Sequence, residues 1–135
     1  MTPYLHRLRV YWEDTDAGGV VFYANYLKFF ERARTEWLRS LGFSQHAMAR
    51  DEDALFVVTD STVAYRAPAR LDDELEVSVD VQRLGSASIT VAQRALRMDA
   101  GHLTVLAQGT VKVGCVHPGT FRPRRIPIAI TEKIA

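Results

Sequence analysis

The chain has 135 residues, of which 47% are hydrophobic and 24% are charged, and its formal net charge is +1. This length and balance favour one globular domain over residues 1–135, and the small net charge gives no reason to expect nucleic acid or an anionic membrane as a partner. Cys115 is the one cysteine, so no intramolecular disulfide is expected. No apolar segment reaches the ~18 residues of a membrane span and the first residues lack a signal-peptide core, so we expect a cytoplasmic protein without a membrane span.

Hydropathy patterns predict a strand, a long helix and then a run of strands. Residues 6–13 partly alternate between apolar and polar, which is typical of a half-buried strand. From Tyr23 the apolar residues recur every three or four positions, which predicts an amphipathic helix that ends at Gly42, with a short helix over 44–50. Four further strands are expected over 55–66, 75–81, 87–98 and 103–116. This order indicates an α+β fold with an antiparallel sheet, whose open edges we expect a homo-oligomer to pair or shield.

The segment with the clearest chemical signal is EDTDAGGVVFYANY at residues 13–26. Two carboxylates, Asp14 and Asp16, precede Gly18 and Gly19 and then the start of the predicted helix. Glycine tolerates positive φ and lets a ligand approach the backbone, and a helix start offers unpaired N–H groups with a partial positive charge. An ionisable carboxylate beside such a helix start suits acyl transfer, in which negative charge develops on a carbonyl oxygen. The residues alone leave open whether either aspartate only closes a turn or caps the helix.

Other catalytic and metal-binding patterns are absent from the sequence. It has no G-x-S-x-G, G-x-G-x-x-G or P-loop motif, and the histidines lack zinc-ligand spacing. An EF-hand loop beginning at Asp14 would place Asn25 where a glutamate is required. Cys115 lies in an apolar strand and is expected to be a small buried side chain. We therefore expect no metal and no separate cofactor.

A basic segment lies near the C-terminus and contains Arg122, Arg124 and Arg125. Guanidinium groups match phosphate oxygens, so these arginines are candidates for binding the phosphates of coenzyme A. The simpler interpretation is a solvated tail that aids solubility.

Five segments spread over nearly the whole chain share motifs with one known family. They are YWEDTDAGGVV at 11–21, ANY at 24–26, FERARTE at 30–36, APARLDD at 67–73 and CVHP at 115–118. They resemble the 4-hydroxybenzoyl-CoA thioesterase-like branch of the hotdog-fold acyl-CoA thioesterases, and most closely its Tol-Pal-associated subgroup. The resemblance implies a long central helix wrapped by a five-stranded antiparallel sheet, with sheets joined across a homodimer or within a homotetramer and active sites between subunits. It also implies hydrolysis of a short-chain aliphatic or aromatic acyl-CoA, with coenzyme A as part of the substrate.

The same resemblance assigns roles to residues of the loop. Asp16 becomes the catalytic carboxylate, acting as nucleophile or general base, whereas Asp14 becomes structural. The backbone N–H of Tyr23 becomes the donor to the oxyanion. The substrate-binding positions are Gly18, Gly19, Val20 and Asn25. The Tol-Pal-associated subgroup usually has histidine where this chain has Tyr23, and a phenol is a poor general base at neutral pH, but a backbone donor does not depend on its side chain.

Two functions of other classes stay open as alternatives. Hotdog domains also serve as hydratases or dehydratases of acyl thioesters, which generally use a histidine beside a carboxylate, and residues 11–40 contain no histidine. A non-catalytic acyl-CoA-binding or scaffold protein would bind the same ligand without releasing thiol, since a shared fold does not fix function.

Overall fold

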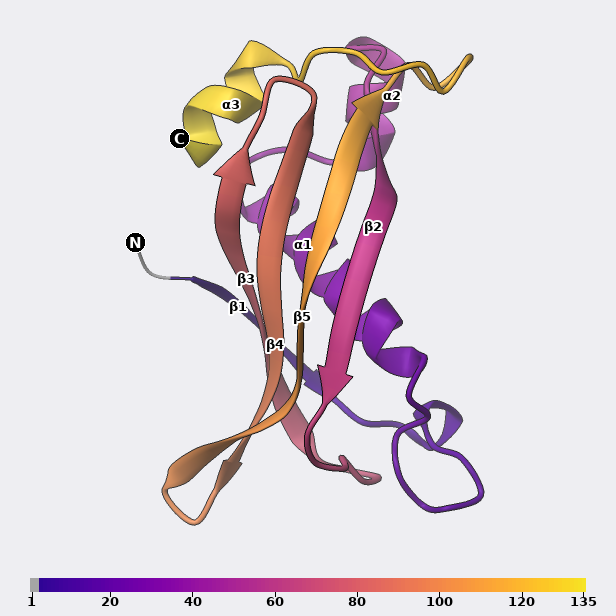
Figure 1. The fold of residues 1–135 in the computed structure, drawn as a ribbon, viewed down its shortest axis with the longest axis vertical. Helices are drawn as coiled ribbons and strands as arrows, with labels where there is room; N and C mark the ends of the chain where they lie inside the picture. Colours follow the sequence, from indigo (N-terminus) through magenta and orange to yellow (C-terminus); the bar gives the residue numbers. More distant parts are fainter. Residues whose placement is uncertain (1–2) are drawn as a thin grey trace.

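The computed structural model describes residues 3–135 and shows a five-stranded antiparallel sheet curved around one long helix (Figure 1). The strands are β1 (Tyr4–Arg9), β2 (Leu55–Tyr65), β3 (Glu74–Leu84), β4 (Ser88–Asp99) and β5 (His102–Val116). The helices are α1 (Asn25–Ser40), α2 (Gln45–Asp51) and α3 (Ile128–Ile134), and a short 3-10 turn covers Trp12–Asp14. The predicted α+β hotdog architecture is confirmed.

The strands follow the order β1-β3-β4-β5-β2 across the sheet, so β1 and β2 form its two edges. The four later strands begin and end close to their predicted positions. The first strand was expected to continue to residue 13 but ends at Arg9. Its extension is replaced by a turn, because the Asp14 carboxylate accepts a hydrogen bond from the Tyr11 backbone N–H at 2.8 Å. Such a local side-chain bond gives the backbone an alternative to the strand ladder.

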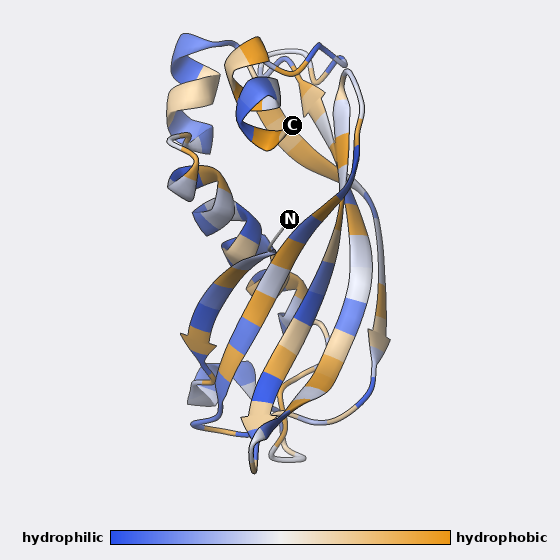
Figure 2. Cartoon of the chain, turned by 90° about the vertical axis from the view of Figure 1, so that its left-hand side faces the viewer, coloured by the Kyte–Doolittle hydropathy of each residue, from blue (hydrophilic) through white to orange (hydrophobic). Residues whose placement is uncertain are grey.

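The core lies between α1 and the concave face of the sheet. Phe29, Phe30 and Ala33 of α1 are fully buried, and they pack with Val77 of β3 and Val91 of β4 in one apolar cluster. Figure 2 shows the alternating apolar and polar bands along the strands that this one-sided burial produces. Burial of one phenylalanine side chain contributes about 1.5–3 kcal/mol, so these contacts dominate the attachment of the helix to the sheet.

Residues next to the helices explain where α1 ends and where α2 begins. Gly42 has φ +95° and the Phe43 N–H donates to Leu38 O at 3.0 Å, so the predicted stop of α1 is confirmed. Ser44 caps α2 through a bond from the Ala47 N–H. The C-terminal helix α3 was not predicted; it packs over the end of the sheet with Ile130 buried. Within the described residues, no helix has the length and apolar character that crossing a membrane requires.

Candidate active site

A tight turn between β1 and α1 carries Asp16. Thr15 and Val21 form an isolated antiparallel bridge, and the Asp16 N–H donates to Val20 O at 3.0 Å. The Gly19 N–H donates back to Asp16 O at 2.9 Å, and Gly19 has φ +78°, a conformation that other L-residues rarely adopt. The second glycine of the motif is therefore required by the geometry of the turn itself.

The Asp16 side chain is exposed and is oriented by its own turn. Its Oδ1 accepts a hydrogen bond from the Gly18 N–H at 2.9 Å, and a Cβ atom at Gly18 would lie 3.1 Å from that oxygen. No group within residues 3–135 donates a hydrogen bond to the other carboxylate oxygen, Oδ2. The carboxylate is thus held in direction while one oxygen stays open to a ligand or to water.

Asp14 has the opposite environment. Only 4% of this residue is exposed, and its two carboxylate oxygens accept bonds from Asn25 Nδ2 at 2.7 Å and from the Tyr11 N–H at 2.8 Å. Its backbone oxygen accepts a bond from the Phe22 N–H at 2.9 Å. Asp14 therefore ties the turn after β1 to the start of α1, as a structural carboxylate does.

The start of α1 presents two unused donors. The Asn25 N–H donates to Phe22 O and the Tyr26 N–H donates to Tyr23 O, whereas the N–H groups of Tyr23 and Ala24 donate to no acceptor within the described chain. Ala24, the N-cap residue, forms no side-chain cap bond. These N–H groups and the partial positive charge of the helix start favour an anionic oxygen beside them.

The predicted substrate-binding residues divide into two groups. Gly18, Gly19 and Val20 share the turn with Asp16, and both glycines are exposed. Asn25 is only 8% exposed, and its side-chain amide donates to the Asp14 carboxylate. The described contacts of Asn25 are thus with the loop, and substrate contact by this residue stays a prediction.

Aromatic side chains surround the helix start. The Tyr23 ring lies 4.9 Å from Phe22 and meets Tyr65 of β2 edge-on at 5.9 Å, measured between ring centroids. Tyr23 is 62% exposed, and Phe22 and Tyr65 beside it are 43% and 46% exposed. Contiguous exposed aromatic surface of this kind is typical of a ligand or protein contact.

The C-terminal arginines lie at the other end of the molecule. The segment 117–127 contacts α2 and the β3–β4 turn, far from the turn that carries Asp16 (Figure 1). Arg124 donates to the backbone oxygens of Glu52 and Asp53, which follow α2. Arg122 and Arg125 are exposed. A single chain therefore does not bring these arginines beside its own Asp16.

A hollow of about 600 Å³ lies between α1 and the edge strand β2. Its lining residues are Leu27, Lys28, Glu31, Arg32, Arg34, Val58, Ser61 and Val111. Arg34 reaches under the helix, where its Nη1 donates to Oε1 of the fully buried Gln93 at 2.9 Å, and burial lowers the pKa of its guanidinium. One signal that could have identified this pair is a glutamine that shares a strand face with the apolar Val91 and Ala95.

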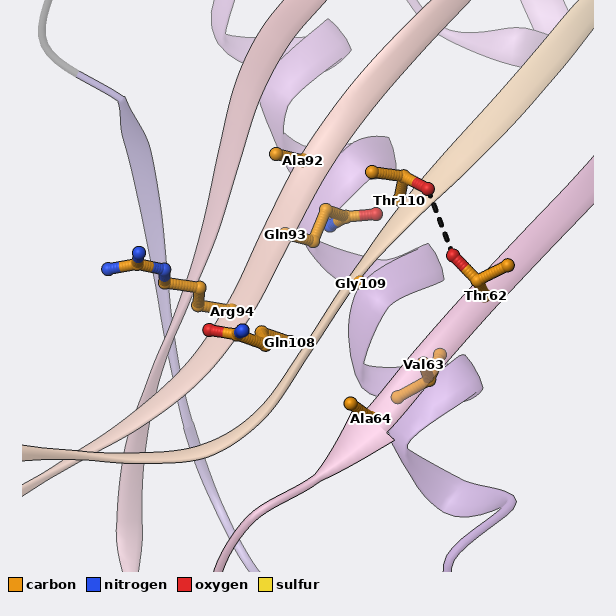
Figure 3. Close-up of a pocket in the computed structure, with 9 residues that line it drawn as sticks. All are labelled: Thr62, Val63, Ala64, Ala92, Gln93, Arg94, Gln108, Gly109 and Thr110. Carbon is orange, nitrogen blue, oxygen red and sulfur yellow. Dashed lines mark hydrogen bonds between the residues drawn. The ribbon is translucent and has the colours of Figure 1, made fainter.

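Another hollow, of about 410 Å³, lies on the face of the sheet opposite α1 (Figure 3). Thr62 and Thr110 share a hydroxyl–hydroxyl hydrogen bond of 3.0 Å there, with Arg94 and Gln108 at the opposite side of the hollow. Neither Asp16 nor Tyr23 lines it. This hollow is therefore separate from the loop–helix site.

Comparisons with known proteins agree with this geometry. Residues 18–101 match the thioesterase superfamily. The chain is 46% identical over 126 residues to the acyl-CoA thioester hydrolase YbgC of Escherichia coli O6:H1, covering 93% of this chain and 91% of the relative. It is 45% identical over 120 residues to the acyl-CoA thioesterase YbgC of Haemophilus influenzae, covering 89% and 85%.

A solved structure gives the same result. A probable thioesterase from Bartonella henselae superposes with a TM-score of 0.86 at 32% identity, covering 93% of this chain and 100% of that chain. The predicted family resemblance is thereby confirmed, and the YbgC relatives are consistent with the predicted subgroup. The chain belongs to the thioesterase superfamily and is a hotdog-fold acyl-CoA thioesterase.

Proposed function

We propose that the loop–helix segment is the active site and that Asp16 and the Tyr23 backbone N–H carry the reaction. The observation that carries this proposal is the open Oδ2 of Asp16 on a turn that leads directly to a helix start with unused N–H groups. The substrate carbonyl oxygen accepts the Tyr23 N–H, so negative charge that develops there is stabilised by a fixed donor and by the helix dipole. The Tyr23 phenol takes no part in proton transfer in this scheme.

Asp16 can act in two ways. As a nucleophile, its carboxylate attacks the thioester carbonyl carbon, the C–S bond breaks to release coenzyme A thiolate, and water then hydrolyses the mixed anhydride. As a general base, it takes a proton from water while the water oxygen attacks the same carbon and the thiolate leaves. A single turnover in H₂¹⁸O detects the anhydride route when water attacks the Asp16 carbonyl carbon of the anhydride. Oxygen-18 in the Asp16 carboxylate, found by peptide mass spectrometry, requires the anhydride.

The acyl group has space along α1. The hollow between α1 and β2 begins at Leu27, one helical turn past Tyr23, and continues to Arg34. The apolar Leu27, Val58 and Val111 in its wall, with the Tyr23–Tyr65 ring pair before the helix, support short-chain aliphatic or aromatic acyl groups as substrates. The kcat/KM values for a panel of both acyl types rank these classes.

We further propose that two chains join at β2 to complete the site. β2 has 11 residues, most of them exposed, and ends at the aromatic cluster, whereas β1 has six residues and Arg7 and Arg9 on it pair with glutamates of β3. An unpaired edge strand favours strand pairing, and β2 carries one charged residue, Asp60. Antiparallel pairing of two β2 strands brings the C-terminal segment of one chain toward the Asp16 turn of the other. Arg122 and Arg125 are then the available phosphate contacts, while Arg124 is engaged with α2.

Thiol release from acyl-CoAs, followed with a chromogenic thiol reagent, tests this function. Cys115 is buried and burial raises the pKa of its thiol, so the native protein itself contributes no fast signal. We expect turnover by the wild type and its loss in Asp16→Asn. Loss of conjugation in a 2-enoyl thioester without thiol release would instead favour the hydratase alternative.

A further inference from the structure

The turn that carries Asp16 is supported from outside by one segment of chain. The Val21 N–H donates to Ala69 O at 2.8 Å, and Val20 forms an isolated antiparallel bridge with Arg70. Ala69 is fully buried beneath this contact. The same segment also bonds to the residue that precedes the loop, since the Val10 N–H donates to Asp73 O at 2.9 Å. The support segment, residues 67–73, therefore touches the chain on both sides of Asp16.

Arg97 of β4 fixes this support segment. Its Nη1 donates to Pro68 O at 2.9 Å and to Asp73 Oδ2 at 3.0 Å. The same Asp73 oxygen accepts the Arg70 N–H at 2.9 Å. One guanidinium nitrogen thus bonds to both ends of the segment, and the carboxylate it binds also holds the residue that pairs with Val20.

The guanidinium itself is held in place. Its Nε donates to the two oxygens of Asp99 at 2.8 and 3.1 Å, near the tip of the β4–β5 hairpin that extends beyond the sheet (Figure 1). The Arg97 side chain is only 21% exposed. Hydrogen bonding to Arg97 lowers the pKa of the Asp99 carboxyl, which favours the charged form that binds the guanidinium. A planar guanidinium can serve these acceptors together, which a lysine ammonium does not reproduce.

We propose that Arg97 is a positioning residue for thioester hydrolysis, which sets the Asp16 carboxylate through residues 67–73 and the Val20–Val21 backbone. This inference rests on the proposed role of Asp16. A displacement of about 1 Å at a reacting group can lower the rate about 10²-fold, so a contact two steps away from Asp16 has measurable leverage on kcat.

The test compares Arg97→Gln with a matched variant on the same strand, Arg94→Gln. Arg94 is exposed on the face opposite α1, and its side chain makes no hydrogen bond within residues 3–135. For Arg97→Gln we expect kcat to fall roughly 10- to 100-fold with KM changed less than about threefold. We expect wild-type kinetics for Arg94→Gln, and a smaller loss for Asp99→Asn, which only loosens the guanidinium.

Making the same substitution in the Asp16→Asn protein separates positioning of Asp16 from general destabilisation of the fold. If Arg97 acts through Asp16, then Arg97→Gln changes the residual rate of Asp16→Asn less than about twofold, because effects within one unit do not add. A global loss of folded protein would lower the rates of the wild type and of Asp16→Asn by the same factor. If Arg97→Gln folds poorly, Asp99→Asn is used for the same comparison.

The outcomes are distinct. Wild-type kcat in Arg97→Gln, or an equal loss in both backgrounds, overturns the role of Arg97 while leaving that of Asp16 intact. Full turnover by Asp16→Asn overturns the proposed function and the positioning role together.

Discussion

Gly18 is the residue at which a single methyl group tests the orientation of the proposed catalytic carboxylate. A Cβ atom there would lie 3.1 Å from Asp16 Oδ1, so Gly18→Ala forces that oxygen to move by a few tenths of an ångström. We predict about a tenfold fall in kcat, with unfolding free energy within about 0.5 kcal/mol of the wild type because the site is exposed. Gly119→Ala, where nothing lies within 4 Å, is the control. Unchanged kcat in Gly18→Ala would show that this carboxylate direction is unimportant.

Tyr23 allows its backbone donor to be separated from its side chain. Proline at this position removes the N–H, which donates to no acceptor within the described residues, so no existing hydrogen bond is lost. We predict a loss of about 10²–10³-fold in kcat for Tyr23→Pro, the usual effect of deleting an oxyanion donor. Tyr23→Phe keeps the N–H and should stay within about threefold of the wild type on the same principle. Equal losses in the two variants, measured by thiol release, would assign the role to the hydroxyl instead.

At the residue scale the sequence indicated a candidate loop but not the contacts that support it. The Gly-Gly pair and the following helix pattern are local features and indicated the loop, whereas the choice of Asp16 over Asp14 and the role of Tyr23 came from the family resemblance. The contacts of Arg97 with Pro68 and Asp73 span 24 or more positions, and no local pattern reports them. Arg34 and Gln93 are 59 positions apart and were missed for the same reason.

The connection between the turn and α1 depends on one buried hydrogen bond. Asn25 Nδ2 supplies a donor to the buried Asp14 carboxylate, and Asn25→Ala leaves Oδ1 without this partner. An unsatisfied buried group of this kind costs about 1–3 kcal/mol, and more when charged. We therefore predict a loss of at least about 1 kcal/mol in urea unfolding, with a lower kcat because the helix start shifts. Unchanged stability, with the exposed Lys28→Ala as control, would contradict this role.

At the scale of elements, periodicity predicted most of the fold. The strands alternate cleanly and α1 is long, so five strands and two helices were expected where they occur, apart from the end of β1. The order β1-β3-β4-β5-β2 depends on long-range pairing and was not predicted. Helix α3 was missed because it is short, follows Pro127 and has β-branched isoleucines, which carry little helical signal.

The whole molecule presents two sheet edges, and we propose that one of them is an interface. Val58 is 52% exposed on β2, so Val58→Lys should cost the isolated fold little while placing a charge on that edge. We predict that the wild type has two or four times the chain mass of 15.2 kDa by light scattering, and that Val58→Lys shifts toward one chain. Leu5→Lys, on the opposite edge β1, is the matched control. A monomeric, fully active wild type would contradict the shared site.

The most direct test of the central claim is the rate of thiol release by Asp16→Asn on the best acyl-CoA of the panel, beside Glu13→Gln as a variant with the same change in charge. Glu13 is an exposed carboxylate three residues earlier. If Asp16 carries the reaction, Asp16→Asn folds as the wild type does and loses about 10²-fold or more in kcat, whereas Glu13→Gln keeps it. Wild-type turnover by a folded Asp16→Asn protein would contradict the account and place the catalytic carboxylate elsewhere.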